Sequence, residues 1–393
     1  MQGRWKIVAA TISILGATTI GATQAEVGVS DKEITIATSN ALSGQSEWAG
    51  RETNIGIQSY FNLVNAEGGI FGRKVKIMNY DDKYEPDEAI QVFKKIVADG
   101  AFGITGVYGS PVSAKYLPLS TLHHVPLAGF YNGTYFVGEP VKKYVFSARP
   151  SYRDEMHDAV DHLWKECGFH KYACIYQNDA YGVDCLEGLK EGLKKYNADV
   201  VATASYTRNH SDVIDAVNEV KKANPDVVFL GAVYKPAAQI VKLAREANWN
   251  PIFVMNSGSS VDAFVGLAGP DAEGKIFTEV VPPPSRTDLP LIEKFQKALK
   301  KYYPNEKPGF VNLRGFMDGV VWTEGLKRAG KDVDREKFVN AMEGIKHLDV
   351  GLGKGMDLSY SPTDHLGLHK VFFGTFKNGQ TVSFEDWKSL KKK

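Results

Sequence analysis

From residue 33 onward, short apolar runs of strand length alternate with longer segments in which apolar residues recur every three or four positions, as in an amphipathic helix. A strand, a helix of this length and a second strand form a βαβ unit, in which the strands are parallel and the crossover is right-handed. The alternation runs in two series that meet near Pro150. We therefore expect an α/β fold with two doubly wound, Rossmann-like lobes.

The second series ends at Pro282-Pro283-Pro284, a stiff extended connector after a strand expected at residues 275–280. Two long helices are expected next, at residues 289–302 and 312–329. The chain then ends differently, because Lys377-Asn378-Gly379-Gln380 is typical of a hairpin turn between two strands. This predicts that the last segment returns to a lobe that is already built.

These breaks divide the chain into a first lobe of residues 26–148 and 281–356 and a second lobe of residues 149–280 and 357–393. At 393 residues the chain is long enough for each lobe to have its own core. Because the chain passes between the lobes several times, the carboxyl ends of strands from both lobes face one crevice, where we expect a ligand to bind.

Residues 1–25 have the features of a secretory signal peptide. Arg4 and Lys6 precede an apolar stretch from Ile7 to Ile20, and Thr23-Gln24-Ala25 provides small residues at a cleavage site. A membrane anchor would need roughly 20 unbroken apolar residues, and this stretch is shorter and contains several hydroxyl side chains. We expect cleavage, which leaves the mature protein in an extracytoplasmic space and shifts the formal net charge from +1 to −1 by removing two basic residues.

A net charge this small gives no electrostatic reason to bind nucleic acid, and the longest basic run noted is the terminal Lys391-Lys392-Lys393. The three cysteines, Cys167, Cys174 and Cys185, allow at most one disulfide, and small buried thiols are the expected state. His123-His124 do not converge on one metal ion because neighbouring residues point apart. We expect neither a metal nor a cofactor.

The turn Gly106-Val-Tyr-Gly-Ser-Pro-Val-Ser113 joins an expected strand to a helix, whose free N–H groups and positive end favour an anion. The turn lacks the lysine of a phosphate-binding loop, the G-x-G-x-x-G spacing of a dinucleotide site and the flanking glycines of a nucleophile elbow. A small carboxylate held by backbone amides and by the hydroxyls of Ser110 and Ser113 is therefore the expected guest. The alternative is that Ser110 is only a helix N-cap.

Aromatic side chains gather where loops leave the expected strands, a position from which they can enclose the apolar body of a ligand. They are Trp48, Tyr108, Phe130, Tyr131, Tyr181 and Tyr234. Each of them alone is also explained by core packing. Asp81-Asp82 ends another expected strand, and we expect these acids to order a turn rather than to act in catalysis.

Several stretches resemble, in order and spacing, the periplasmic leucine/isoleucine/valine-binding proteins of ABC transporters. They are LSGQSEWAG (42–50), NAEGGIFGRKVKIMNYDD (65–82), YEPDEAIQVFKKIV (84–97), NDAYG (178–182) and GAVYKPAAQIVKLAREANW (231–249). The resemblance extends from about Glu33 to the final hairpin. It implies the type I periplasmic binding fold, in which two lobes on a three-crossing hinge close around a small ligand and deliver it to a membrane permease.

The resemblance also implies ligand-binding positions in both lobes. The first lobe would hold a carboxylate through Ser110, with Tyr131 and Asn132 at the next strand exit in place of the family's small residue and threonine. Tyrosines of the second lobe and a tryptophan at the cleft would enclose the body of the ligand. In this chain those aromatic positions are Trp48, Tyr181 and Tyr234.

Two departures from the family pattern bear on the ligand and on a disulfide. The amino-acid binders have an acidic residue at about Ser257 that pairs with the ligand ammonium, whereas this chain has no acid between Met255 and Asp262. A buried ammonium without a counter-charge is costly, so either another acid reaches the cleft or the ligand is not an α-amino acid. Tyr84 stands where one family cysteine would be, and the family's disulfide in the first lobe is not expected here.

We therefore expect a monomeric periplasmic solute-binding protein without catalytic activity. Its expected ligand is a small carboxylate with an apolar or aromatic body, and its expected partner is the permease of an ABC importer. The alternatives are a binder of branched-chain or other amino acids, a ligand-sensing receptor subunit and an extracytoplasmic enzyme. For the enzyme, the sequence singles out no nucleophile, acid or base.

Overall fold

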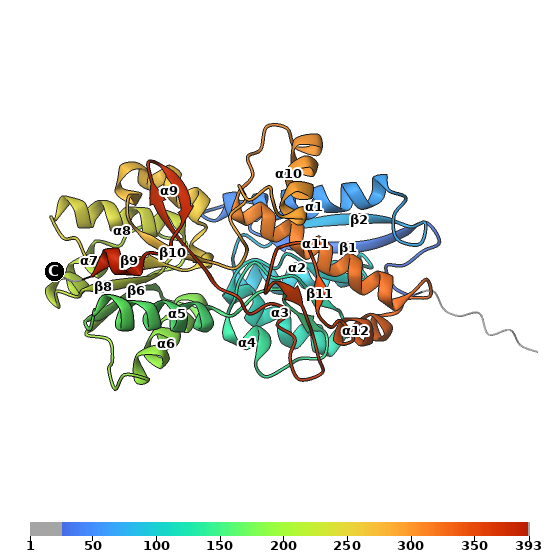
Figure 1. Cartoon of the computed structure of the whole chain (residues 1–393). Helices are drawn as coiled ribbons and strands as arrows, with labels where there is room; N and C mark the ends of the chain where they lie inside the picture. Colours follow the sequence, from blue (N-terminus) through green and yellow to red (C-terminus); the bar gives the residue numbers. More distant parts are fainter. Residues whose placement is uncertain (1–25, 392–393) are drawn as a thin grey trace, which may run out of the picture.

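The computed structural model describes residues 26–391, which form two α/β lobes side by side, joined by three passages of the chain (Figure 1). The chain leaves the first lobe after β5 (Val145–Phe146), returns to it after β10 (Ile276–Glu279), and enters the second lobe again before β13 (Phe372–Lys377). The expected signal peptide lies outside the described residues. No helix in the described part of the chain has the length and apolar character to cross a membrane.

The first lobe is built on a parallel sheet of five strands in the order β2-β1-β3-β4-β5. Its strands are β1 (Glu33–Asn40), β2 (Lys74–Asp81), β3 (Gly103–Thr105), β4 (Leu127–Ala128) and β5. The strands β1 and β2 pair along their full length, with Ile36 opposite Ile77. The strands β3 to β5 are only two or three residues long, so the turns that follow them begin early and lie at the crevice.

The helices of the first lobe come from two separate segments of the chain. They are α1 (Glu47–Ala66), α2 (Pro86–Ala98), α3 (Ser110–His123), α4 (Tyr135–Gly138), α10 (Pro290–Tyr302), α11 (Phe310–Ala329) and α12 (Arg335–Glu343). The helices α1 and α11 approach closely, because a Cβ atom on Gly56 would lie 1.9 Å from the Asn312 carbonyl oxygen. Likewise, a Cβ atom on Gly315 would lie 2.2 Å from the Thr53 carbonyl oxygen. These glycines attach the later segment to the lobe that was built first.

The second lobe has a sheet of seven strands in the order β14-β13-β10-β9-β8-β6-β7, in which β13 and β14 are antiparallel and the others parallel. Its other strands are β6 (Tyr172–Gln177), β7 (Ala202–Tyr206), β8 (Val227–Gly231), β9 (Ile252–Met255) and β14 (Gln380–Ser383). Asn378 and Gly379, with φ of 51° and 72°, form the turn between β13 and β14. The predicted closing hairpin is therefore confirmed.

Among the described residues, the second lobe has five α-helices, of which the first two begin at side-chain caps. They are α5 (Tyr152–His162), α6 (Ala180–Lys194), α7 (Ile214–Lys222), α8 (Tyr234–Glu246) and α9 (Val261–Ala268). Ser151 and Asp154 form a capping box at the start of α5, and the Asp179 side chain accepts a hydrogen bond from the Tyr181 N–H at the start of α6. All three cysteines are buried and unpaired within residues 26–391, as expected for small core thiols.

The third passage between the lobes lies later than the sequence predicted. After β11 (Leu348–Asp349) and β12 (Asp357–Leu358), the chain stays on the first lobe. The Ser147 N–H donates to the His365 carbonyl at 2.9 Å, and the His365 ring stacks on Phe146 with centroids 4.0 Å apart. The change of lobe expected at residues 356–357 therefore takes place just before β13, because these contacts hold the preceding segment on β5.

A buried acid lies in the first lobe next to the hinge. Asp318 on α11 is 6% exposed and packs against Gly129, on which a Cβ atom would lie 2.5 Å from the Asp318 carboxyl carbon. Burial raises the pKa of Asp318 to about 8, while Arg314 and Arg149 act in the opposite direction. Because the unfolded chain has an ordinary carboxyl pKa of ~4, the folded protein binds this proton more tightly, and the free energy of unfolding falls as the pH rises from about 4 to about 8.

We expect the substitution Asp318→Asn to remove this pH dependence. The free energy of unfolding of the variant should exceed that of the parent by an amount that grows with pH, by up to ~1.4 kcal/mol per pH unit between about pH 5 and pH 8. Urea unfolding at several pH values measures the difference. Two parallel stability curves would show that the Asp318 carboxyl is not protonated in the folded state.

Candidate ligand-binding site

The first wall of the cleft between the lobes is the turn from β3 to α3. Gly106 and Gly109 adopt φ of 64° and 89°, a region that L side chains rarely enter. A Cβ atom on Gly109 would also lie 2.1 Å from the ring of Tyr84. Glycine at position 109 therefore allows the turn to close against Tyr84, and Ser110 begins α3 immediately after it.

Ser110 presents a hydroxyl group to the cleft. Its side chain is fully buried, and its Oγ has no hydrogen-bond partner among residues 26–391. It is not an N-cap, since Gly109 occupies that position and α3 has no side-chain cap. Buried polar groups without a partner are uncommon. This one lines the inter-lobe cavity beside the free N–H groups of a helix, an arrangement suited to an anionic oxygen.

Ser113 and Asn132 lie behind this turn and brace it. The Asn132 Nδ2 donates to Ser113 Oγ at 2.8 Å and to the Val107 carbonyl at 3.3 Å. Both side chains are buried. Neither Ser113 nor Asn132 is among the described residues that line the inter-lobe cavity. Their contacts hold the loop after β4 against the first turn of α3, so they position the wall without facing the ligand space.

The opposite wall comes from the second lobe, at the starts of α5 and α6 and the single helical turn Ser257–Ser259 after β9. A Cβ atom on Gly258 would lie 2.7 Å from the Tyr152 hydroxyl and 2.8 Å from the ring of Tyr181, so glycine is needed for this close packing. The Tyr181 hydroxyl donates to Asn256 Oδ1 at 2.7 Å, which fixes the ring.

Five tyrosines from the two walls fill the centre of the cleft, and we call the space between them the tyrosine cavity. The residues that line it are Tyr84, Tyr108, Gly109, Ser110, Tyr131, Tyr152, Tyr181, Val233 and Gly258. The rings of Tyr108 and Tyr131 lie 4.6 Å apart, and those of Tyr152 and Tyr181 lie 5.2 Å apart, measured between centroids. In this closed conformation the rings leave room for roughly one water molecule. A larger ligand therefore enters only when the lobes separate.

The tyrosine cavity is electrically neutral at its surface. Burial raises the pKa of all five tyrosines, so each stays a neutral phenol. Among the described residues that line the cavity, none carries a charge. The nearest guanidinium groups lie behind the rings: Arg149 is 5.0 Å from the Tyr152 ring centroid, and Arg314 is 4.5 Å from that of Tyr131.

Ser257 lies outside the tyrosine cavity, in a buried polar cluster. Its N–H donates to Glu155 Oε2 at 2.9 Å and its hydroxyl donates to Glu155 Oε1 at 2.7 Å. Arg149 Nη2 lies 2.6 Å from both Glu155 Oε1 and Ser257 Oγ, and Thr278 also donates to Glu155. Glu155 is therefore an acid that lies beside Ser257, although the sequence has no acid at position 257 itself. Both of its oxygens are already bound within the protein.

Tyr234 and Trp48 lie at the edge of the cleft. Neither is among the described residues that line the tyrosine cavity. The Tyr234 hydroxyl donates to the Gln45 carbonyl of the other lobe at 2.8 Å, and the Tyr234 and Trp48 rings meet edge to face at 6.2 Å. Other contacts between the lobes are Gln177 to Tyr84, Tyr131 to Ser260, Arg208 and Asn209 to Glu85, and the Tyr135 N–H to Asp184.

Several residues of the site were not predicted from the sequence. Tyr84 and Tyr152 line the tyrosine cavity, and Arg149 and Arg314 lie behind it. Arg314 had a detectable signal, because it is a charged residue within the predominantly buried helix α11. Tyr152 and Arg149 had none, since Arg149 lies in a connecting segment before Pro150 and Tyr152 is the first residue of the next helix. Within residues 26–391 no group of three or more histidine, cysteine or acidic side chains is placed to hold a metal ion.

Comparisons with known proteins agree with this architecture. The sequence matches the periplasmic binding protein family over residues 33–381. The Leu/Ile/Val-binding protein of Escherichia coli is 27% identical over 285 residues, which cover 71% of this chain and 76% of that protein. The Leu/Ile/Val-binding protein homolog 3 of Brucella melitensis is 23% identical over 379 residues, which cover 95% of this chain and 100% of that protein.

Solved structures confirm the predicted two-lobed type I fold. A possible leucine/isoleucine/valine-binding protein from Rhodopirellula baltica superposes with a TM-score of 0.87 at 25% identity, covering 94% of this chain and 99% of that one. A branched chain amino acid ABC transporter protein from Thermus thermophilus with bound valine gives 0.82 at 18% identity, covering 91% and 96%. The chain thus belongs to the periplasmic binding protein family, of the branched-chain amino acid type, and is a solute-binding protein rather than an enzyme.

Proposed function

We propose that this protein captures a small carboxylate in the periplasm and delivers it to the permease of an ABC importer. The ligand has an apolar or aromatic body and no α-ammonium group. The observation that supports this ligand class is the neutral lining of the tyrosine cavity among the described residues, together with the unpartnered hydroxyl of Ser110. The transport role is proposed because a neighbour of the same fold is named as a branched chain amino acid ABC transporter.

The acids near the cleft do not offer a free charge to a ligand ammonium. Glu155 is paired with Arg149 at 2.6 Å and hydrogen-bonded to Ser257 and Thr278. Burial raises the pKa of Glu279 to about 8, so this carboxyl is protonated at neutral pH. An ammonium enclosed by phenol rings would therefore be desolvated without an ionic partner, which is costly.

A carboxylate, in contrast, has suitable partners in the first lobe. Ser110 Oγ can donate one hydrogen bond, and the N–H groups of Ser110 and Val112 can donate others at the positive end of the helix. Pro111 has no N–H, and that of Ser113 donates to the Gly109 carbonyl at 3.0 Å. The rings and Val233 then face the remainder of the ligand, and such surfaces favour an apolar or aromatic body. The fold does not itself require an amino acid, since a fatty acid ABC transporter substrate-binding protein from Thermomonospora curvata shares it at a TM-score of 0.83 and 22% identity.

The second candidate is a branched-chain amino acid, because the relatives from Escherichia coli and Brucella melitensis are named for leucine, isoleucine and valine. This alternative requires an acid to leave its present partners when the lobes open. The two candidates differ in one chemical group, so ligands that differ only by the ammonium separate them.

We expect calorimetry with such matched pairs to favour the ligands without the ammonium. The pairs are 4-methylpentanoate against leucine and 3-phenylpropanoate against phenylalanine. In at least one pair the plain carboxylate should bind about tenfold more tightly or better, because the ammonium has no ionic partner in the cavity. Tighter binding of leucine than of 4-methylpentanoate would instead support the second candidate, a branched-chain amino acid.

The substitution Ser110→Ala should lower the affinity for the tighter carboxylate by about tenfold to a hundredfold, the effect of losing one hydrogen bond to a charged group. The melting temperature without ligand should stay nearly unchanged, because Ser110 Oγ has no partner to lose within the described chain. The matched control is Ser113→Ala, which removes the acceptor of the Asn132 amide. It should lower the melting temperature more than Ser110→Ala does. An unaltered affinity in Ser110→Ala would remove this hydroxyl from the site.

The substitution Tyr234→Phe should weaken ligand binding by roughly threefold to tenfold, because it removes one hydrogen bond that forms only when the lobes close. The control is Tyr196→Phe, whose hydroxyl bonds to Asp161 within the second lobe. Calorimetry on both variants measures the difference. Equal effects of the two substitutions would mean that the contact between Tyr234 and Gln45 does not contribute to closure.

A further inference from the structure

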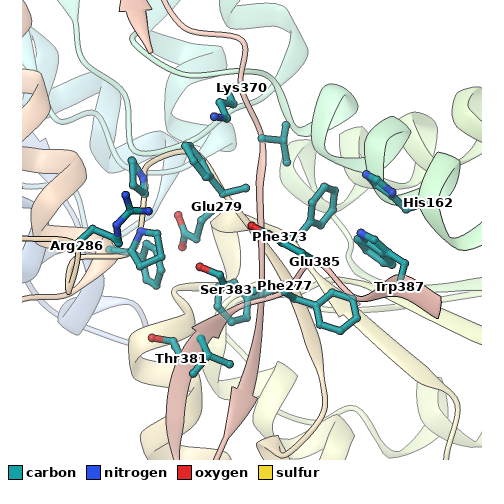
Figure 2. A pocket seen from close by; sticks show the side chains of 18 of the residues that line it. His162, Phe277, Glu279, Arg286, Lys370, Phe373, Thr381, Ser383, Glu385 and Trp387 are labelled. Atoms are coloured by element: carbon teal, nitrogen blue, oxygen red, sulfur yellow. The ribbon is translucent and has the colours of Figure 1, made fainter. Parts of the chain in front are cut away.

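A second cavity, of about 530 Å³, lies at the hinge on the side of the second lobe (Figure 2). We call it the hinge cavity. Two of the three passages between the lobes border it, at residues 282–286 and 370–373. Its volume lies in the range of small-molecule sites, ~300–1,000 Å³. Among the described residues, none lines both this cavity and the tyrosine cavity.

The walls of the hinge cavity are largely aromatic. Phe277 of β10 and Phe373 of β13 lie at the centre of the view in Figure 2, with Trp387 to one side. Phe310, at the start of α11, adds a ring from the first lobe. Rings in this arrangement offer both apolar contact and the negative faces that attract a cation.

One carboxylate oxygen of a buried acid in this wall lacks a hydrogen-bond partner among the described residues. Glu279 ends β10 and is 1% exposed, and its Oε1 accepts no hydrogen bond from any residue between 26 and 391. The other oxygen accepts a long hydrogen bond from the Val280 N–H at 3.4 Å and forms an ion pair with Arg314, whose Nε lies 3.9 Å away. Figure 2 shows the carboxylate among the lining side chains, between Arg286 and Phe373. A buried polar atom of this kind calls for a donor from outside the chain.

The charges around the hinge cavity favour a cation over an anion. Two further acids, Glu166 and Glu385, belong to its lining, and Glu166 is bound to the His162 ring. Of the basic residues in the lining, Arg286 is already paired with Asp288 through two hydrogen bonds of 2.7 Å. Lys370 extends over the Phe372 ring, 5.0 Å from its centroid. An anion placed beside Glu279 would keep this carboxyl protonated and gain no ion pair, whereas an ammonium would supply the missing donor and pair with the ionised carboxylate.

We propose that the hinge cavity is a second binding site, for a small organic ammonium whose nitrogen contacts Glu279 and whose apolar or aromatic body packs against Phe277, Phe373 and Trp387. Burial raises the pKa of Glu279 to about 8, so the free site carries a proton on this carboxyl at pH 7. The charged groups that face Glu279 are Arg314, Asp262, Glu155 and Arg149. When the ammonium binds, the carboxylic acid becomes a carboxylate in an ion pair, and its proton passes to the buffer.

The test uses 2-phenylethylamine as the probe, with the full mature protein and titration calorimetry at pH 7. We expect saturable binding and the release of close to one proton per site, measured from the heats in two buffers of different ionisation enthalpy. At about pH 9, above the raised pKa of Glu279 and still below that of the amine, the released fraction should fall toward zero. 3-Phenylpropanoate, which has the same ring and a carboxylate instead of the amine, should not compete at this site.

Two variants keep the proposal falsifiable. Glu279→Gln removes the carboxyl group that ionises when the ammonium binds. Ser383→Trp places a large ring in the cavity from an exposed position on β14, so it should fold even if the first variant does not. Each should weaken binding of 2-phenylethylamine at least tenfold. The proposal is overturned by an absence of saturable binding to the parent protein, or by unchanged affinity in Ser383→Trp.

The cleft variant Ser110→Ala separates this site from the proposed transport site. It should leave the affinity for 2-phenylethylamine unchanged, because Ser110 lines the other cavity. If Ser110→Ala abolishes amine binding while Ser383→Trp does not, the amine binds in the cleft and the hinge site is refuted. If 3-phenylpropanoate binds and the amine does not, only the hinge proposal fails.

Discussion

The buried ion pair between Arg149 and Glu155 is the contact on which the rest of the site depends. Arg149 comes from the first passage between the lobes, Glu155 from the helix that follows it, and both bind Ser257 in the turn after β9. Removing one partner from such a pair leaves an unpaired buried charge, at a cost of roughly 3–5 kcal/mol. The pair therefore holds three separate segments together at the base of the cleft. The pair also occupies the carboxylate of Glu155, the acid that contacts Ser257.

The character of the cleft follows from this arrangement. With Glu155 engaged by Arg149, the ligand space is bounded by phenol rings, two glycines, one valine and the Ser110 hydroxyl. The glycines at 109 and 258 let these rings approach the turns of both lobes. Because the rings leave so little free volume, the proposed ligand would have to displace some of the ring–ring contacts. The hydrogen bonds from Tyr234 to Gln45 and from Gln177 to Tyr84 join the lobes around this space.

Much of the fold could be predicted from the sequence, because strands buried on both faces and amphipathic helices leave strong periodic patterns. The strand expected at residues 275–280 and the helix expected at residues 289–302 appear at residues 276–279 and 290–302. The third passage was placed too early, since the contacts of His365 with β5 are tertiary and have no local signal. The ligand-binding site was harder to predict from the sequence. The turn at Gly109 and Ser110 is a local motif, whereas Tyr152 and Arg149 reach the cleft only through packing between distant segments.

The most direct test of the central claim is a crystal structure of the protein with the best-binding plain carboxylate. The ligand carboxylate should lie on Ser110 Oγ and the first N–H groups of α3, its body should lie among the tyrosine rings, and Glu155 should still be paired with Arg149. A bound α-amino acid whose ammonium contacts Glu155 or another acid that has left its present partners would contradict it.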